Sequence, residues 1–262
     1  MTLRRDAETL LGRGLVSTGL HRPMTGERGI VVAFHRVNDT IPEDGLTRTS
    51  RDFERFCRFF KANYDVVSLD EFIRRLSSGG SIAGTLAITF DDGYLDNYEV
   101  AAPILYRLGL PSTFFVVTQF LGTNVVPWWD VKLVRQPGWM TWDQVRSLRD
   151  QGFDIGAHTR THVDLGQVDG DDAELEIRGS KADIETNLGV TPRHFAYPYG
   201  GPKNLLESNR ERTRAAGFTS CVSCHGGTAR SGTDAFRLRR IPLATWFRTP
   251  EQFAFEVSTR RE

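Results

Sequence analysis

Two carboxylates and two imidazoles in this sequence have the residue types and spacing of a catalytic metal site. Asp91 and Asp92 stand side by side after an apolar segment, and His158 and His162 follow later in the run His-Thr-Arg-Thr-His. Imidazoles four positions apart lie on one face of a helical turn, and one carboxylate completes a three-ligand zinc site with a position open for water. The other carboxylate is then free to act as a general base.

Each half of this pattern has a simpler alternative interpretation. An Asp-Asp-Gly run is most often a turn, and a His-x3-His pair is commonly part of a solvated helix surface. The segments 86–90 and 153–157, which precede the two runs, favour a site because both read as buried strands with polar tips. Gly93 permits the sharp turn that two neighbouring carboxylates need to serve one site, since neighbours on a strand point to opposite faces.

Strands and helices are expected to alternate along most of the chain. The expected strands are 30–35, 85–90, 112–117, 153–158, 194–198, 218–222 and 238–243, and the expected helices are 51–63, 68–77, 97–108, 141–151, 171–188 and 204–216. This alternation predicts an α/β fold with a largely parallel sheet, and the number of strands favours a barrel over an open dinucleotide-binding sheet.

A barrel brings the carboxyl ends of its strands together at one face, where barrel enzymes carry their active sites. The residues expected at or near those ends are His35, Asp91, His158 and Tyr199. The chemistry of these residues and the predicted architecture therefore indicate the same place for the site.

Three motifs resemble those of the polysaccharide deacetylase family, also called the NodB-homology or carbohydrate esterase 4 family. They are Thr-Phe-Asp-Asp-Gly at 89–93, His-Thr-Arg-Thr-His at 158–162 and Phe-Ala-Tyr-Pro-Tyr-Gly at 195–200, and their order and spacing match across 29–245. The resemblance implies a distorted (β/α)7 barrel of the NodB-homology type. It also implies metal-dependent hydrolysis of the N-acetyl group of an amino sugar in a polysaccharide or glycan precursor, with release of acetate.

The resemblance further implies a role for each motif residue. Zinc, or another divalent metal such as Co2+ or Ni2+, is expected on Asp92, His158 and His162. Asp91 is then the general base, and the backbone N–H of Tyr199 completes an oxyanion hole. An amide nitrogen leaves poorly unless it is protonated, so the site also needs a general acid.

The general acid and the partner of the base depart from the pattern of many relatives. The late Leu-x-His motif that supplies the acid is absent from 238–243. His35 is the candidate acid, as in the exopolysaccharide and poly-N-acetylglucosamine deacetylases that this sequence resembles most, and a structural histidine is the alternative. Where relatives carry an arginine that holds the base, this chain has Ala196. Arg237 or Arg240 could supply that charge, unless both form ordinary surface salt bridges.

The candidates for contact with substrate are Pro198, Trp128, Trp129, Arg237 and Arg240. The two tryptophans lie in a long connection after a strand, where barrel enzymes place binding residues, and sugar rings stack on such side chains. Most tryptophans are core residues, and Trp142 at the start of a helix is expected to be structural.

The composition is that of an ordinary globular enzyme. Among 262 residues, 33 basic and 33 acidic side chains leave no net charge that would attract nucleic acid. No apolar run is long enough to span a bilayer, and the charged start lacks the apolar stretch of a signal peptide, so a cytoplasmic protein is expected. The run Cys221 to His225 matches the spacing of c-type haem attachment, but that chemistry belongs to exported proteins, and we expect free thiols or a redox pair.

Residues 1–28 are expected to form an amphipathic helical extension before the catalytic domain at 29–262. Its apolar residues recur at helical spacing among arginines: Leu3, Ala7, Leu10, Leu11, Leu15 and Val16. This stripe either lies peripherally on the inner membrane surface, near a lipid-linked saccharide substrate, or packs against the bottom of the barrel.

Two other functions stay open at this stage. The same scaffold could carry another metal-dependent acyl hydrolase or esterase, or a noncatalytic carbohydrate-binding protein that has lost its acid. The position of His35 distinguishes these alternatives, because an imidazole far from the metal ligands would leave the role of the acid unfilled.

Overall fold

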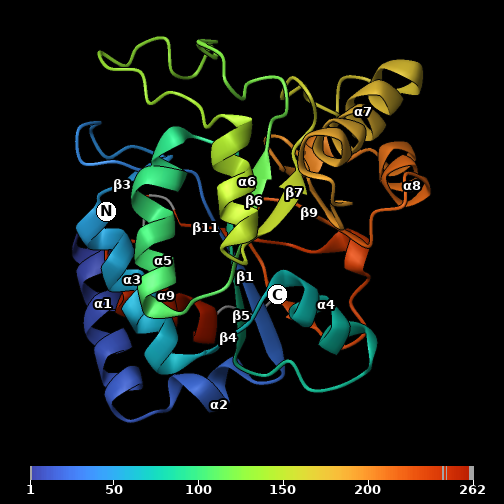
Figure 1. Cartoon of the computed structure of the whole chain (residues 1–262). Coiled ribbons are helices and arrows are strands. Elements are labelled where there is room, and N and C mark those ends of the chain that lie inside the picture. The colour runs from blue at the N-terminus through green and yellow to red at the C-terminus, as the bar shows by residue number, and fades with distance from the viewer. Residues whose placement is uncertain (1, 244, 246, 260–262) are drawn as a thin grey trace.

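The computed structural model describes residues 2–243, 245 and 247–259 and has the expected α/β architecture (Figure 1). The main sheet runs in the order β10-β1-β5-β6-β7-β8-β9, and its strands from β1 to β9 are parallel. These parallel strands are β1 (Arg28–Phe34), β5 (Thr85–Phe90), β6 (Ser112–Val116), β7 (Asp154–Ala157), β8 (His194–Ala196) and β9 (Ser220–Val222). β7 therefore ends directly before the motif at 158–162, whereas β5 and β8 end within the motifs at 89–93 and 195–200.

The segment 238–242 joins the two sides of the curled sheet. Leu238 pairs with Val222 of β9, and Ile241 of β11 (Ile241–Pro242) pairs with Val32 of β1. The long strand expected at 238–243 is therefore wrong in its extent, because this segment serves two neighbours in succession. The other short strands are β2 (Arg36–Val37), β3 (Thr47–Arg48), β4 (Asp65–Val66) and β10 (Ala229–Arg230).

Three of the helices begin directly after a polar residue that caps them. Thr49, Ser68 and Thr141 each accept a backbone N–H in the first turn of the helix that follows. The helices are α3 (Ser50–Asn63), α4 (Leu69–Ser77), α5 (Ala102–Leu108), α6 (Trp142–Asp150), α7 (Gly170–Leu188) and α8 (Glu207–Ala215). Two expected helices start late: a π-helical segment, Asn97–Ala101, precedes α5, and a 3-10 turn, Pro202–Asn204, precedes α8.

A layer of phenylalanines lies directly below the strand ends that carry the site. Phe34 and Phe90 stack with ring centroids 5.5 Å apart, Phe90 and Phe114 stack at 4.8 Å, and Phe53 of α3 meets Phe34 edge-on at 5.0 Å. All four are buried. Burial of each such side chain contributes about 1.5–3 kcal/mol, so the ends of β1 and β5 are firmly held.

The N-terminal helix packs against the last helix and leaves an apolar face uncovered. α1 (Thr2–Ser17) and the short α2 (His21–Thr25) lie beside α9 (Pro250–Thr259) (Figure 1). The approach is close at Gly12, where a Cβ atom would lie 1.9 Å from the carbonyl oxygen of Glu251. On the uncovered face of α1, the exposed fractions of the leucines are 87% for Leu3, 69% for Leu10 and 55% for Leu11. Within the described part of the chain, no helix is both long enough and apolar enough to cross a membrane.

Candidate active site

The motif residues meet at one cavity at the carboxyl ends of β1, β5, β7 and β8. The cavity has a volume of about 310 Å³. The ionisable residues of its lining are His35, Asp91, Asp92, His158, His162, Tyr197, Tyr199 and Cys224. The strand register explains this convergence in part, because Phe34 pairs with Phe90 and the next residues of both strands then lie side by side.

Three side chains of metal-ligand type form a buried cluster in this cavity. Oδ1 of Asp92 lies 3.4 Å from Nε2 of His158 and 3.2 Å from Nε2 of His162. All three side chains are buried. Burial acts to raise the pKa of the Asp92 carboxyl, but the two imidazoles outweigh it and hold that pKa well below its ordinary value.

The cluster fits a divalent metal ion. Nδ1 of His158 lies 2.8 Å from the carbonyl oxygen of Ala196, so this nitrogen carries the proton and Nε2 offers its lone pair to the cluster. Oδ1 of Asp92 is buried and has no hydrogen-bond partner among the described residues, which is costly unless a cation satisfies it. One carboxylate and two imidazoles are a common ligand set of catalytic zinc sites.

The backbone of the site is strained. The described residues other than glycine that have positive φ are Asp92 at 75°, Thr159 at 64°, His162 at 61° and Tyr199 at 61°, all within the three motifs. Such residues cost about 1–3 kcal/mol each and persist only where surrounding structure holds them. The helical turn expected for His158 and His162 is therefore wrong: the segment is a loop, and its backbone reversals bring the imidazoles together.

Glu176 of α7 holds this loop, and no sequence motif indicated it. Its carboxylate accepts the backbone N–H groups of Arg160 at 2.8 Å and Thr161 at 3.0 Å, and also the hydroxyl of Thr161 at 2.8 Å. Within the loop, Oγ1 of Thr159 accepts the N–H of His162 at 3.0 Å. These bonds offset the backbone strain, so the position of His162 depends on the packing of α7.

Arg240 holds the expected base. Its guanidinium donates from Nη1 to Oδ1 of Asp91 at 2.7 Å and from Nη2 to Oδ2 at 2.6 Å, and both side chains are buried. The guanidinium also donates to Oγ1 of Thr89 at 2.9 Å and to the carbonyl oxygen of Ser223 at 2.8 Å. Burial acts to raise the pKa of Asp91, but attraction to Arg240 and His158 outweighs it, and the pKa lies below its ordinary value.

His35 follows β1 and lies beside the base. Its Nε2 is 3.9 Å from Oδ2 of Asp91, and its side chain is 18% exposed. Its backbone carbonyl accepts a hydrogen bond of 2.7 Å from Nδ2 of Asn97, in the π-helical segment. Burial lowers the pKa of the imidazole, and the two aspartates raise it less, so the pKa lies below its ordinary value. The role of His35 as acid stays a prediction.

The two candidate tryptophans line the wall of the cavity. The ring of Trp129 lies 4.5 Å from the imidazole of His162, and its Nε1 donates to the hydroxyl of Tyr94 at 2.8 Å. Trp128 is 72% exposed and donates from Nε1 to the hydroxyl of Tyr199 at 3.2 Å. The structure thus brings one indole onto the imidazole of His162 and the other to the mouth of the cavity.

A buried polar chain behind Trp129 was not predicted. The hydroxyl of Tyr94 donates to Asp130 at 2.8 Å, and Asp130 forms an ion pair with Arg36. Arg36 is 1% exposed and also binds Asp44 at 2.7 Å. The position of Asp130 directly after the two tryptophans is the only sequence signal that could have indicated this support.

Other candidates lie away from the cavity wall. Arg237 is exposed and binds Glu207 at 2.7 Å, and Pro198 is buried without lining the cavity. Arg240 reaches the base but not the cavity surface. Burial raises the pKa of both Cys221 and Cys224 to about 12, so both are protonated thiols at neutral pH.

Solved structures of other proteins share this fold. The deacetylase PplD of Streptococcus pyogenes, in complex with acetate, superposes with a TM-score of 0.74 at 22% identity, over 86% of this chain and 96% of that one. IcaB of Ammonifex degensii superposes with a TM-score of 0.73 at 23% identity, over 89% of this chain and 98% of that one. The distorted α/β barrel that the motifs predicted is therefore confirmed.

Sequence comparisons agree with the fold. The poly-beta-1,6-N-acetyl-D-glucosamine N-deacetylase of Escherichia coli K12 is 24% identical over 296 aligned positions, which cover 98% of this chain and 41% of that protein. The chain spans half or less of the length of the first curated relatives that it matches. The family model for polysaccharide deacetylases matches residues 79–220, more than half of the chain and all three motifs. This protein therefore belongs to the polysaccharide deacetylase family.

Proposed function

We propose that this protein hydrolyses the N-acetyl group of an amino sugar within a polysaccharide or glycan precursor and releases acetate. The observation that carries the proposal is that Asp92, His158 and His162 share one cavity with the Arg240-bound carboxylate of Asp91. The Escherichia coli relative is named for a polymer of N-acetyl-D-glucosamine, which supports an N-acetylated amino sugar as the substrate class.

A divalent metal such as zinc, held by Asp92, His158 and His162, would supply Lewis-acid polarisation of the water and of the acetamide carbonyl. The remaining steps belong to the chain. Asp91, ionised at neutral pH beside Arg240, accepts the proton of the attacking water. The backbone N–H of Tyr199, fixed in a left-handed turn, donates to the carbonyl oxygen as negative charge develops.

The leaving nitrogen needs a proton, and His35 delivers it. Burial lowers the pKa of His35, so the imidazole is largely neutral at pH 7 and must gain a proton during the reaction. Oδ2 of Asp91 lies 3.9 Å from Nε2 of His35, beyond direct hydrogen-bond distance, so the proton that the carboxylate takes from water reaches the imidazole through one bridging water and then passes to the amine.

Trp128 is the proposed contact with the sugar ring. Its indole is 72% exposed at the cavity, where it presents a flat apolar face, and the hydroxyl of Tyr199 orients it. Trp129 is held by Tyr94 and packs on His162. Its proposed role is therefore to position the imidazole of His162 and not to contact the sugar.

Acetate release from a panel of N-acetylated glycans, measured on metal-loaded protein before and after chelation, tests the function. We expect release that stops with a chelator and returns with zinc, cobalt or nickel. Asp91→Asn is expected to keep the metal and lose about 10²–10⁴-fold in turnover, because an amide cannot accept the water proton. Asp143→Asn, at a 90% exposed carboxylate of α6, is the matched control and should leave turnover unchanged.

Two outcomes would replace the proposal. Acetate released from O-acetylated but not N-acetylated glycans would make the protein an esterase. Glycan binding without release of acetate by metal-loaded protein would make it a carbohydrate-binding relative.

The cytoplasmic location expected from the sequence stays a prediction.

We also propose that α1 rests on an anionic membrane surface. Its exposed leucines lie among Arg4, Arg5 and Arg13, a combination that favours the interface of an anionic bilayer. A variant with Leu3, Leu10 and Leu11 changed to glutamine should no longer sediment with phosphatidylglycerol vesicles. Leu175→Gln, at a 57% exposed leucine of α7, is the control and should sediment like the wild type. Equal sedimentation of both variants would contradict membrane contact through α1.

A further inference from the structure

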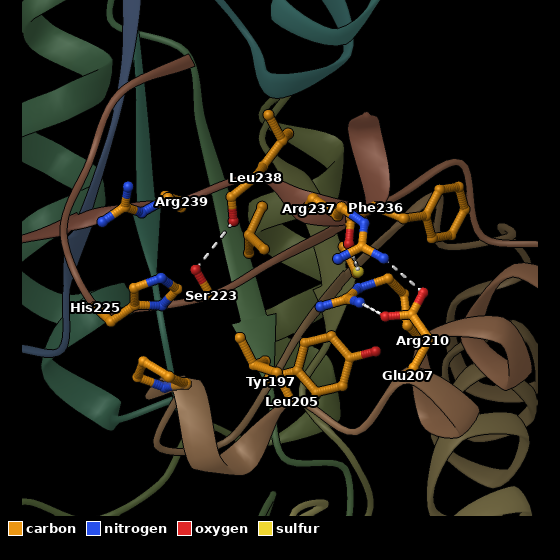
Figure 2. Close-up of a pocket in the computed structure, with 13 residues that line it drawn as sticks. Tyr197, Leu205, Glu207, Arg210, Ser223, His225, Phe236, Arg237, Leu238 and Arg239 are labelled. Carbon is orange, nitrogen blue, oxygen red and sulfur yellow. Dashed lines mark hydrogen bonds and ion pairs between the residues drawn. The ribbon is translucent and has the colours of Figure 1, made fainter. Parts of the chain in front are cut away.

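A second cavity shares a wall with the active site. Figure 2 shows the residues that line this second cavity. Its volume is about 370 Å³. Tyr197 lines both cavities, and the consecutive residues Cys224 and His225 line the active site and the second cavity, respectively. The rest of the wall comes from 221–223, from 236–239, from the first turn of α8 and from Pro202 and Leu205 before that helix. Nothing in the hydrolytic mechanism uses this space.

The second cavity is rich in arginine. Its lining contains Arg210, Arg237 and Arg239 but a single carboxylate, that of Glu207. Figure 2 shows Glu207 at one end, where it joins Arg210 and Arg237, whereas Arg239 lies at the other end beside His225. Asp234 lies outside the lining with Oδ2 3.8 Å from Nε of Arg237, so three guanidinium groups face two carboxylates and the cavity keeps a net positive charge. We call it the arginine cavity.

The donors at both ends are incompletely satisfied. Arg210 is 7% exposed, yet its Nε is buried without a hydrogen-bond partner, and the same holds for Nε of Arg239 within the described residues. No described carboxylate lies within ion-pair distance of Arg239. A buried donor without an acceptor costs free energy, so a ligand that supplies acceptors is favoured here.

The backbone makes room for Arg239. A Cβ atom on Gly227 would lie 2.5 Å from Nε of Arg239, and Gly227 has a φ of 120°, which favours glycine. The next residue, Arg240, reaches Asp91 in the active site. Two consecutive arginines of one extended segment thus lie on opposite sides of it, Arg239 in the second cavity and Arg240 at the carboxylate of Asp91, as alternation along an extended chain requires.

The contacts of Glu207 show that Arg210 and Arg237 together bind a carboxylate group. Its carboxylate receives Nη1 of Arg210 through one oxygen and Nη2 of Arg237, at 2.7 Å, through the other. The glutamate side chain is 56% exposed and stands at the edge of the cavity, so it can swing into solvent. Guanidinium groups match carboxylate and phosphate oxygens with charge-assisted hydrogen bonds.

We propose that the arginine cavity binds an oxyanion, a phosphate or carboxylate group, between Arg210 and Arg237, and that this group displaces the carboxylate of Glu207. Arg239 supplies uncompensated positive charge at the other end. The anion comes either from an acidic glycan whose acetamide enters the neighbouring cavity or from free phosphate. The site exists independently of the hydrolytic reaction, so its test does not depend on deacetylase activity.

Calorimetric titration of the metal-loaded protein with inorganic phosphate, at constant ionic strength in chloride, tests the site. Arg237→Gln should weaken binding about tenfold, because it removes charge-assisted hydrogen bonds. Glu207→Gln should strengthen binding, because it removes the competing carboxylate. The two changes lie on exposed side chains and act in opposite directions, so a general loss of folding cannot imitate them.

Arg51→Gln is the matched control. Arg51 is exposed and lines a separate arginine-rich cavity with Arg48, Arg55 and Arg248, so this change removes the same charge elsewhere. It should leave the dissociation constant for phosphate unchanged. The proposal is overturned if phosphate does not bind saturably, if Arg237→Gln binds as the wild type does, or if Glu207→Gln binds no tighter.

A competition experiment identifies the source of the anion. An oligosaccharide that contains glucuronate and a neutral N-acetylglucosamine oligomer of equal length are each added to the phosphate complex. Displacement by the acidic oligomer alone, lost in Arg237→Gln, assigns the cavity to the glycan. Phosphate binding that neither oligomer affects assigns it to the free anion. Displacement by both oligomers equally would overturn a charge-based site.

Discussion

Replacing Arg240 with methionine is expected to destabilise the protein strongly, because the buried carboxylate of Asp91 loses its partner. The two side chains are 0% and 2% exposed, so no water replaces the guanidinium. Removal of one partner of a buried ion pair typically costs about 3–5 kcal/mol, a large part of the 5–15 kcal/mol that stabilises a typical domain. The guanidinium carbon of Arg240 also lies 5.3 Å from the centroid of the Phe115 ring, so methionine removes this cation–π contact together with the ion pair but keeps apolar bulk at the position.

A double-mutant cycle isolates that charge. Asp91→Asn removes the stranded carboxylate, so the double variant should regain about 2–4 kcal/mol relative to Arg240→Met alone. Urea denaturation of metal-loaded protein measures all four proteins. Arg237→Met, at an exposed guanidinium of the same segment, is the control and should cost less than about 1 kcal/mol. Equal costs of Arg240→Met and Arg237→Met, or a double variant less stable than Arg240→Met, would refute the reasoning.

Three further changes test two histidines of the site and the buried carboxylate of Asp96, which accepts the backbone N–H of Val37 at 3.1 Å. His158→Ala should bind metal far more weakly, since one of three ligands is lost, and metal analysis showing zinc retained at wild-type affinity would exclude it as a ligand. His35→Gln should lose amide hydrolysis more than hydrolysis of matched esters, because an alkoxide leaves more readily than an amide anion; equal losses in kcat would indicate a positioning role. Burial raises the pKa of Asp96 to about 6, above its ordinary 3.8, so the folded state holds this proton more tightly than the unfolded state. That stabilisation, about 3 kcal/mol, is present below pH 4 and is lost as pH rises through 6. Asp96→Asn should remove this dependence from urea unfolding measured between pH 4 and 6, and an unchanged slope would contradict the assignment.

The strand ends were predictable because they depend on neighbouring residues. An apolar run that stops at a polar residue marks both the end of a buried strand and the start of a site, and β5 has the bounds expected from 85–90. In-register pairing of Phe34 with Phe90 then places His35 beside Asp91. Parallel strands put such ends at one face, so the cavity could be expected before its geometry was known.

The conformation of the histidine loop could not be predicted from its spacing. His158 and His162 are four positions apart, which suits a helical turn as well as the observed loop. The loop forms because Glu176, on a helix beyond the motif, accepts its backbone N–H groups and offsets the strain at Thr159. Spacing within a motif does not record a partner that lies outside it.

The sequence by itself determined the fold class, the motif residues that meet in the cavity and the chemistry they suit, since these follow from local apolar patterns and residue types. Only the tertiary structure decided that Arg240 and not Arg237 holds Asp91. Both arginines lie on one short segment, and the choice depends on how that segment crosses from β9 to β1 and which side chain it turns inward. Which charged residues pair across long sequence distances depends on how the sheet closes, and local sequence patterns carry no information about that closure.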